Sequence, residues 1–320
     1  MSLVVLRPGT LTTLQDRGRQ GWRALGVGAA GAMDEVSLRL ANALVGNPDD
    51  AVALELTWSG PHLRFDRDAL IAICGAACDM RVDGAGVAGW RALRIEAGSE
   101  LDCGALRHGA RACLAIAGGF AVERVLGSGA TDLNAAIGSF DGRALRAGDR
   151  LAWNPPCVSL HARRWSLDPQ PWFDGHADAP IRLIAGSHAG LLDAESRAAL
   201  HAATFRVHAD SNRVGVRLEG PTLALASAFE TVSEPVACGT VQLPPAGRPI
   251  VLMAEHPTTG GYPRVGQVAA IDLPRFAQRR PGDPVRFRPI GLDEAQSRYL
   301  ARERALERLI LSMTQRLADD

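Results

Sequence analysis

Residues 26–47 read GVGAAGAMDEVSLRLANALVGN, and their first six letters have the spacing G-x-G-x-x-G. In a dinucleotide-binding fold this hexamer follows a buried parallel strand and opens a helix, with an acidic residue about 20 positions further on. Asp49 and Asp50 satisfy the last condition, but residues 15–25, QDRGRQGWRAL, are polar and rich in turn formers. The hexamer therefore does not predict an NAD site. A second copy, residues 84–89, lies between two strand-like runs and predicts a hairpin turn.

Outward from this stretch, the chain consists mostly of short apolar or alternating runs that Gly, Pro and Asp interrupt. Helices are expected at 33–45 with Asp34 near the start as cap, at about 191–203, and from Asp293 onward. The last of these has an apolar stripe at helical spacing, which suits packing on its own domain or docking on a partner: Leu306, Leu309, Ile310, Met313 and Leu317. Because strands do not alternate with helices, the sequence predicts a mainly β fold of barrels or sandwiches.

The two halves of the chain share four short landmarks in the same order. They pair 59–63 with 219–223, 118–120 with 260–262, 125–133 with 264–273, and 145–149 with 280–283. A Pro- and Trp-rich segment separates the halves. We therefore expect an N-terminal β domain over 1–160, a linker over 155–180, and a C-terminal β domain with the final helix over 180–320.

The composition excludes several classes of function. The formal net charge is zero, so no basic surface for nucleic acid is expected. The chain has 35 arginines and no lysine, which excludes a lysine Schiff base, a P-loop lysine and a biotinylated lysine. Any ATP or biotin chemistry must then use a site on another chain. Arginine remains available to bind carboxylates or phosphates.

The cysteines and the apolar runs bear on the compartment of the protein and on metal binding. The six cysteines are scattered without metal-ligand spacing, so we expect free thiols in a reducing compartment and no metal site. The first apolar run is broken by Arg7 and Pro8, and no apolar stretch reaches ~18 residues. The sequence thus predicts a cytoplasmic protein with no membrane partner.

Long motifs of this chain resemble the family of 5-oxoprolinase C subunits, also called KipA-like, allophanate hydrolase subunit 2-like or biotin-dependent carboxyltransferase-like. The motifs, which together extend over roughly residues 7–290, are TLQDRGRQGWRALGVGAAGAMDEVSLRLANALVGN with ALELTWSGPHLRF, LGSGATDLNAAIGSFDGRALRAGDRL, SNRVGVRLEGP, and GTVQLPPAGRPIVLMAEHPTTGGYPRVGQVAAIDLPRFAQRRPGDPVRF. The resemblance implies two cyclophilin-like β-barrel domains. It also implies ATP-dependent opening of 5-oxo-L-proline to L-glutamate in a complex with A and B subunits of 5-oxoprolinase, with ATP and magnesium bound through the complex.

The chain departs from the family pattern at two places. Gly129-Ala130 stands where an Arg-Ser pair is expected, and Pro235 follows Ser233-Glu234 where glycine is usual. The same signature also serves carboxyl transfer from biotin to urea or a small amide, and a non-catalytic regulatory binder of a partner protein is a further alternative. Any of these roles leaves the isolated chain without ATP-dependent turnover of its own.

The first candidate site is the polar loop at residues 15–19. Opening a lactam requires a polarised amide oxygen, an activated water and a hold on the substrate's carboxylate. Asp16 suits a general base or an orienting group, and Gln15, Arg17 and Arg19 suit binding of a carboxylate or phosphate. A salt-bridged structural turn is the alternative.

The second candidate site follows Glu255 and His256, the nearest residues suited to proton transfer. Hydroxyls, backbone amides and a guanidinium there favour anion binding: Thr258, Thr259, Gly260, Gly261, Tyr262 and Arg264. Asn212, Arg213 and Gln242 are added as substrate-binding candidates. Glu55, in an apolar strand, must be paired, and an arginine is the expected partner. We expect the loops at 15–19 and 256–264 to line one groove.

Overall fold

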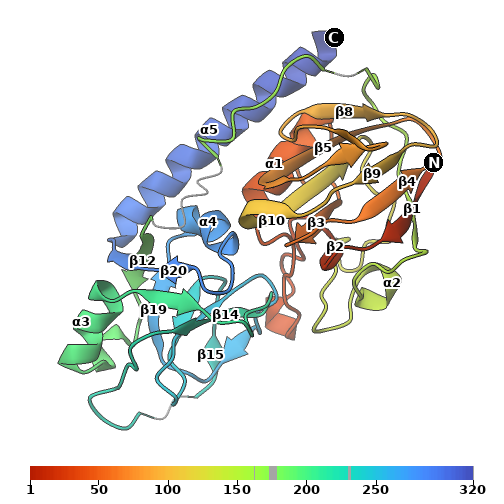
Figure 1. Cartoon of the computed structure of the whole chain (residues 1–320). Coiled ribbons are helices and arrows are strands. Elements are labelled where there is room, and N and C mark those ends of the chain that lie inside the picture. The colour runs from red at the N-terminus through yellow and green to blue at the C-terminus, as the bar shows by residue number, and fades with distance from the viewer. Residues whose placement is uncertain (162, 173–178, 230–231, 320) are drawn as a thin grey trace. The chain divides into compact units, whose positions relative to one another are not determined.

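The computed structural model describes residues 1–161, 163–172, 179–229 and 232–319. The chain forms two compact units (Figure 1). Unit 1 comprises Met1–Arg19, Ala30–Gly175 and Leu306–Asp320, and unit 2 comprises Gln20–Ala29 and His176–Ala305. Both units are built mainly from strands, with few helices, which confirms the predicted fold class. The expected domain limits at 160 and 180 stay a prediction.

Unit 1 has two antiparallel sheets. The six-stranded sheet has the order β11 (Arg150–Ala152), β1 (Ser2–Arg7), β4 (His62–Phe65), β9 (Glu100–Asp102), β6 (Arg81–Val82) and β7 (Ala85–Gly86). The five-stranded sheet has the order β2 (Leu11–Gln15), β3 (Ala53–Thr57), β10 (Leu106–Ile116), β5 (Ala69–Cys78) and β8 (Ala92–Ile95). Leu3 and Phe65 from the first sheet share one core with Leu54 and Ile71 from the second, so the sheets close around a common interior. A short helical turn, α2 (Ser139–Gly142), lies in the loop before β11.

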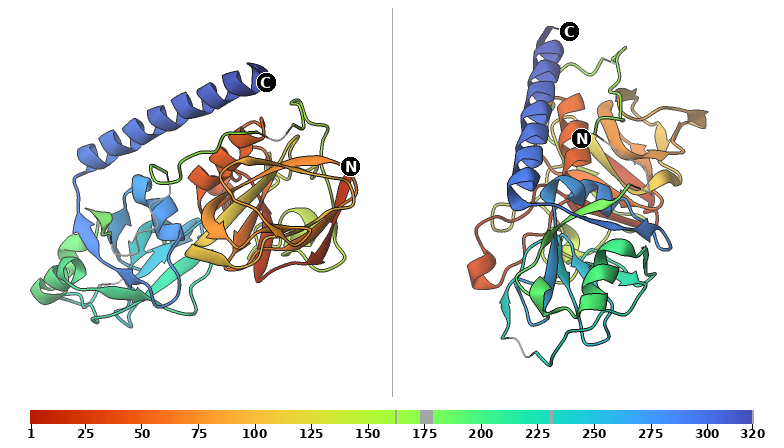
Figure 2. Two further views of the ribbon diagram at one scale, coloured as in Figure 1. Left: turned by 45° about the horizontal axis from the view of Figure 1, so that its top comes forward. Right: turned by 90° about the vertical axis from the view of Figure 1, so that its left-hand side faces the viewer.

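Helix α1 (Glu35–Leu44) covers the outer face of the five-stranded sheet (Figure 2). The Asp34 side chain caps it by accepting from the Ser37 amide at 3.0 Å, as the sequence predicts. Leu38 and Leu40 pack on Leu70 and Cys74, whereas the neighbouring β5 residues face the common interior. Strand β5 is therefore buried on both faces, which explains its continuous apolar run.

The two glycine hexamers have different structural roles, and neither lies in a βαβ unit. At the second, Asp83 and Gly84 have φ of 49° and 82° and join β6 to β7 in a hairpin, so the turn predicted over 84–89 lies at the first residue of the hexamer, and Ala85–Gly86 are strand. In the first, Gly26 with φ of 81° ends the 3-10 helix η1 (Arg23–Leu25). The strand before it, β2, pairs antiparallel with β3, so the surroundings of a dinucleotide loop are missing here.

Unit 2 has one large sheet and one small one. The eight-stranded sheet has the order β20 (Pro284–Val285), β13 (Phe205–Val207), β14 (Gly215–Glu219), β17 (Ile250–Leu252), β16 (Thr240–Gln242), β19 (Arg264–Val268), β12 (Ile181–Ala185) and β21 (Phe287–Pro289). Its pairings among the described residues are antiparallel except that of β12 with β21. The small sheet pairs β15 (Glu234–Pro235) with β18 (Thr259–Gly260). The short helices are η2 (Ala189–Leu191), α3 (Ala194–Ala202), η3 (Ala270–Asp272) and α4 (Leu273–Ala277).

The final helix, α5 (Leu292–Asp319), belongs to unit 2 through Ala305 and to unit 1 from Leu306 onward. Leu306 and Met313 are buried against the core beneath α1, and Leu309 and Ile310 pack on the same cluster. The predicted apolar stripe is thus covered by the chain itself. Among the helices of the described residues, none is both long and apolar enough to cross a bilayer.

One of the four repeated landmarks forms the same turn in both units. The Arg146 amide donates to the Asp149 carboxylate at 2.7 Å, and the Arg280 amide donates to the Asp283 carboxylate at 2.8 Å. In each turn the glycine before the aspartate, with φ of 90° or 87°, donates its amide to a valine carbonyl at 2.8 Å. The Gly-Pro landmark, in contrast, precedes β4 in unit 1 but follows β14 in unit 2.

Candidate functional site

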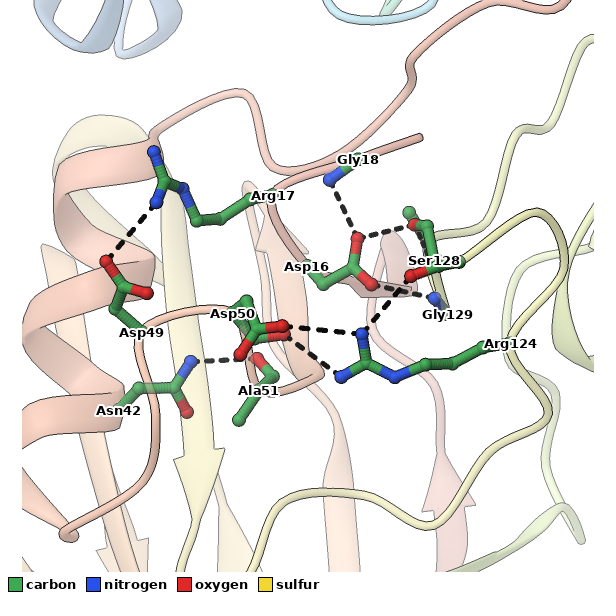
Figure 3. Close-up of polar contacts among 12 residues, drawn as sticks. Asp16, Arg17, Gly18, Asn42, Asp49, Asp50, Ala51, Arg124, Ser128 and Gly129 are labelled. Carbon is green, nitrogen blue, oxygen red and sulfur yellow. Dashed lines mark hydrogen bonds and ion pairs between the residues drawn. The ribbon is translucent and has the colours of Figure 1, made fainter. Parts of the chain in front are cut away.

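The predicted site residues form two sets, one in each unit. In unit 1 the buried Asp16 carboxylate accepts three hydrogen bonds (Figure 3): from the Gly18 amide at 2.7 Å, the Ser128 hydroxyl at 2.6 Å and the Gly129 amide at 2.7 Å. These bonds join the end of β2 to the loop before α2. Of the two roles predicted for Asp16, this arrangement, in which three of about four acceptor positions are filled by the protein, favours orienting over proton transfer.

The neighbours of Asp16 divide between the buried loop and the surface. Gln15 is buried and donates to the Thr131 carbonyl at 2.9 Å, and buried Arg19 donates to the Ala130 carbonyl. Arg17 is 43% exposed and pairs instead with Glu35 at 2.8 Å and with Asp49. Gln15, Asp16 and Arg19 therefore hold the segment 128–131, while Arg17 lies over the start of α1.

The departure at Gly129 has a steric explanation. A Cβ at this position would lie 2.6 Å from a methyl carbon of Val52 and 2.7 Å from one of Val122. Any larger residue must displace these side chains, which would disturb the Gly129 amide that Asp16 holds. The packing around residue 129 therefore favours glycine, where the resemblance led us to expect an arginine.

A cavity of about 360 Å³ adjoins this loop within unit 1. Val52, Phe120 and Val122 give it apolar walls, and Asp50 and Arg124 are its charged lining residues. The Arg124 guanidinium lies 3.4 Å from the Asp50 carboxylate, and the two side chains are 43% and 54% exposed (Figure 3). The sequence did not indicate this pair, because an isolated Asp and a distant Arg carry no recognisable spacing.

Glu55 contacts the backbone just before helix α1. The buried Glu55 carboxylate accepts from the Met33 amide at 2.6 Å. A backbone N–H just before α1 therefore holds the protein's own glutamate. The Met33 amide is a main-chain donor that the sequence did not indicate, and the expected arginine partner of Glu55 stays a prediction.

In unit 2, Glu255 forms a buried ion pair with Arg213. The Arg213 Nε lies 2.5 Å from the Glu255 carboxylate, and the Glu255 amide donates to the Arg213 carbonyl at 2.9 Å. Asn212 accepts from the amides of Val214 and Gly215 at 2.9 and 3.2 Å, so its side chain shapes its own loop. The side chains of Glu255, Arg213 and Asn212 thus bond to one another or to groups of their own loop. These bonds fix the backbone next to His256.

His256 is buried, and its Nδ1 lies 2.6 Å from the Pro257 carbonyl. Because a carbonyl only accepts, Nδ1 carries the proton, and in the neutral ring Nε2 is an acceptor. Burial lowers the pKa of His256, the nearby Arg23 charge lowers it further, and the hydrogen bond to Pro257 opposes both. A neutral imidazole of this tautomer has the chemistry of a general base at Nε2.

The loop after His256 presents hydrogen-bond donors. Gln242 is buried, and its Nε2 has no hydrogen-bond partner among the described residues. Gly260 lies opposite it, and a Cβ at Gly260 would lie 2.4 Å from that nitrogen, so a larger residue there would require the Gln242 amide to shift. Thr259 and Gly260 form β18, and the Tyr262 side chain is 45% exposed. Gln242 and the loop at 258–264 therefore offer several hydrogen-bond donors, which suit a ligand that carries oxygen atoms.

Arg264 anchors this loop to the Ser233-Glu234-Pro235 segment. Its guanidinium pairs with Glu234 and donates to the Pro235 carbonyl at 3.1 Å, and its amide donates to His188 Nδ1 at 3.0 Å. Pro235 stands opposite Thr259 in the β15–β18 pair. The departure from glycine at 235 is thus accommodated at the edge of a two-stranded sheet, where a proline is tolerated. In the residues that the structure describes, no three Cys, His or acidic side chains cluster as metal ligands.

Comparison with known proteins identifies the family of the chain. The family described as "Carboxyltransferase domain, subdomain A and B" matches residues 25–289. The chain belongs to this family.

Within it, the chain is 38% identical to the C subunit of 5-oxoprolinase from Escherichia coli over 96% of this chain and 97% of that protein. It is 34% identical to the C subunit of 5-oxoprolinase from Haemophilus influenzae over 96% of each chain. The crystal structure of the K. lactis urea amidolyase superposes with a TM-score of 0.87 at 29% identity, covering 96% of this chain but 20% of that one.

Proposed function

We propose that this chain is the C subunit of an ATP-dependent 5-oxoprolinase that hydrolyses 5-oxo-L-proline to L-glutamate together with A and B subunits. The observation that carries the proposal is the 38% identity over nearly the full length of the E. coli C subunit. Identity to the K. lactis urea amidolyase is lower, and the chain spans a fifth of that enzyme. The six free cysteines support a cytoplasmic location.

Within this function we assign proton transfer to His256, with Glu255 and Arg213 fixing the chain beside it. The donors of Gln242 and of the loop 258–264 would bind substrate oxygens, since Gln242 Nε2 is buried with an unused hydrogen. Asp16 would position the segment 128–131 rather than take up a proton. ATP with magnesium supplies activation of the lactam oxygen, and we assign its site to the partner subunits because this chain has no lysine.

A reconstitution tests the proposal. The chain is co-expressed with candidate A and B subunits, and glutamate release from 5-oxo-L-proline is measured with and without ATP. We expect ATP-dependent release by the complex and none when this chain is omitted or assayed alone. ATP-dependent turnover by the purified chain alone would contradict the assignment, as would a well-formed complex that releases no glutamate.

The structural similarity to urea amidolyase supports one second candidate, a carboxyltransferase module that acts with a biotinylated partner on urea or a small amide. This function predicts carboxyl transfer from carboxybiotin and no response to 5-oxo-L-proline. The same purified chain, supplied with carboxybiotin and either urea or acetamide, decides between the two.

A further inference from the structure

We propose that Arg23 binds a carboxylate beside His256 in unit 2 and thereby makes this site specific for an anionic ligand. The inference rests on the proposed function for the identity of that ligand, since 5-oxo-L-proline carries a carboxylate whereas urea and simple amides carry none. Arg23 is not one of the arginines that the sequence favoured for anion binding.

Arg23 reaches the site from a segment that core packing does not explain. After Arg19 the chain leaves unit 1, residues 20–29 belong to unit 2, and the chain returns to unit 1 at Ala30. The 3-10 helix η1 in this segment buries no residue, and Leu25 at its end is 74% exposed. The helix therefore presents the Arg23 side chain to unit 2 without adding a buried apolar side chain.

Backbone hydrogen bonds place Arg23 at the turn that contains His256. The partly buried guanidinium donates to the Val236 carbonyl, and the Val236 amide donates to the Thr258 carbonyl at 3.1 Å. Thr258 follows His256 by two residues. Burial lowers the pKa of His256 and the Arg23 charge lowers it further, against the hydrogen bond to Pro257. The guanidinium therefore lies within electrostatic reach of the imidazole.

Arg23 carries a charge that the described residues do not neutralise. Two other guanidiniums of this region have carboxylate partners, Arg213 in Glu255 and Arg264 in Glu234. Among the residues that the structure describes, no carboxylate pairs with Arg23, whose hydrogen bond goes to a backbone carbonyl. A guanidinium has five N–H donors, so Arg23 keeps both its charge and several donors for an anion.

A buried neutral donor lies close to the residue that Arg23 contacts. A Cβ at Gly260 would lie 2.4 Å from Gln242 Nε2 and 3.3 Å from a methyl carbon of Val236, so both side chains border the same space. Gln242 Nε2 is the buried donor that lacks a partner among the described residues. Val236 thus has the Arg23 guanidinium at its carbonyl and the Gln242 amide beside its side chain.

The two donors suit two different oxygen groups of one ligand. A guanidinium binds a carboxylate through two parallel charge-assisted hydrogen bonds, whereas a neutral NH₂ group suits a carbonyl oxygen. We therefore assign the substrate carboxylate to Arg23 and the lactam oxygen to Gln242. A neutral ligand leaves the Arg23 charge without a counter-charge, so it should bind more weakly at this site.

Two matched ligands test the inference by ligand-observed NMR titration of the full chain. The probes are 5-oxo-L-proline and 5-oxo-L-prolinamide, which differ only in that an uncharged amide replaces the carboxylate. We expect the acid to bind at least ~10-fold more tightly than the amide, a difference of about 1.4 kcal/mol. Equal binding of the two ligands, or no binding of the acid, would overturn the inference.

Variants locate the preference for the acid. Arg23→Gln removes the charge and should bind the acid and the amide with equal affinity, through a loss of about tenfold or more for the acid alone. Arg206→Gln is the matched control and should keep the full preference, because Arg206 also lies in unit 2 and donates to a backbone carbonyl, that of Gly282 at 2.9 Å.

A preference for the acid that persists in Arg23→Gln would overturn the inference, and so would a preference that Arg206→Gln also removes. Loss of both ligands in Arg23→Gln would contradict it as well, because only the carboxylate is assigned to Arg23. The comparison of the two ligands on the unaltered chain needs no variant, so misfolding cannot rescue the proposal.

The outcomes separate this inference from the proposed function. If the reconstituted complex hydrolyses 5-oxo-L-proline and Arg23→Gln leaves KM unchanged, Arg23 does not bind the substrate carboxylate although the function stands. If the complex releases no glutamate but the chain prefers the acid in an Arg23-dependent manner, the role of Arg23 stands and the proposed function fails.

Discussion

Asp16 and Asp50 are two carboxylates of the same unit with opposite surroundings. Asp16 is buried, and its two oxygens accept from three protein donors at 2.6–2.7 Å. Asp50 is 54% exposed, and its carboxylate lies 3.4 Å from the Arg124 guanidinium. The first geometry fixes a loop, and the second leaves the carboxylate in contact with solvent. Chemical type alone does not distinguish these roles.

Replacing Asp16 with Asn should lower the free energy of unfolding by about 1–3 kcal/mol. An amide offers one oxygen, so its NH₂ group would face either the Gly129 amide or the Gly18 and Ser128 donors without an acceptor. Urea unfolding measures the effect. Asp50→Asn is the matched control and should change the unfolding midpoint little, because that carboxylate is exposed. Equal effects of the two changes would mean that the three hydrogen bonds to Asp16 contribute no more to stability than the exposed Asp50 carboxylate does.

His256 predicts a pH dependence of stability. Burial lowers its pKa in the folded chain, so between that pKa and the ordinary value of ~6.5 the unfolded state binds a proton that the folded state does not. Stability is therefore greatest above pH ~6.5 and falls as the pH decreases through this window. We expect His256→Gln to flatten that fall.

The measurement is urea unfolding at a series of pH values between 7 and 5. Burial also lowers the pKa of His201, so this residue contributes to the same loss of stability at low pH. His201→Gln should therefore also flatten the fall in stability. An unchanged slope in His256→Gln would show that the imidazole takes up its proton equally in the folded and unfolded chain.

At the scale of elements, α5 illustrates what periodicity predicts and what it leaves open. The stripe at helical spacing predicts one buried face, and Leu306 and Met313 are buried. Periodicity carries no information about the surface that this face meets, since any apolar surface suffices. The structure places it against α1 and the five-stranded sheet, elements far earlier in the chain.

Truncating Leu306 to Ala should lower the free energy of unfolding by roughly 2–5 kcal/mol, as expected for a fully buried leucine. Leu311→Ala on the same helix is the control, because Leu311 is 59% exposed. Urea unfolding followed by tryptophan fluorescence compares the two variants. A similar small effect for both would mean that the helix contributes little to unit 1.

For the whole molecule, the β-rich composition, the three expected helices, the Asp34 cap and the 81–86 hairpin could be predicted from the sequence, because each depends on local spacing. The contacts of charged side chains could not. Glu55 accepts from the Met33 amide, and Arg17 pairs across the start of α1. Such contacts depend on which loops the fold brings together. The same holds for the Asp50–Arg124 cavity.

The course of the chain has a consequence for its synthesis on the ribosome. The chain passes between the units after Arg19, Ala29, Gly175 and Ala305, so unit 1 contains segments from both sides of unit 2. At about 5–20 residues per second, translation of His176–Ala305 takes on the order of ten seconds. During that interval the apolar surface of unit 1 that Leu306 and Met313 later cover is open to solvent. The nascent chain is then a natural client for chaperones, and its first unit matures only after its second has been made.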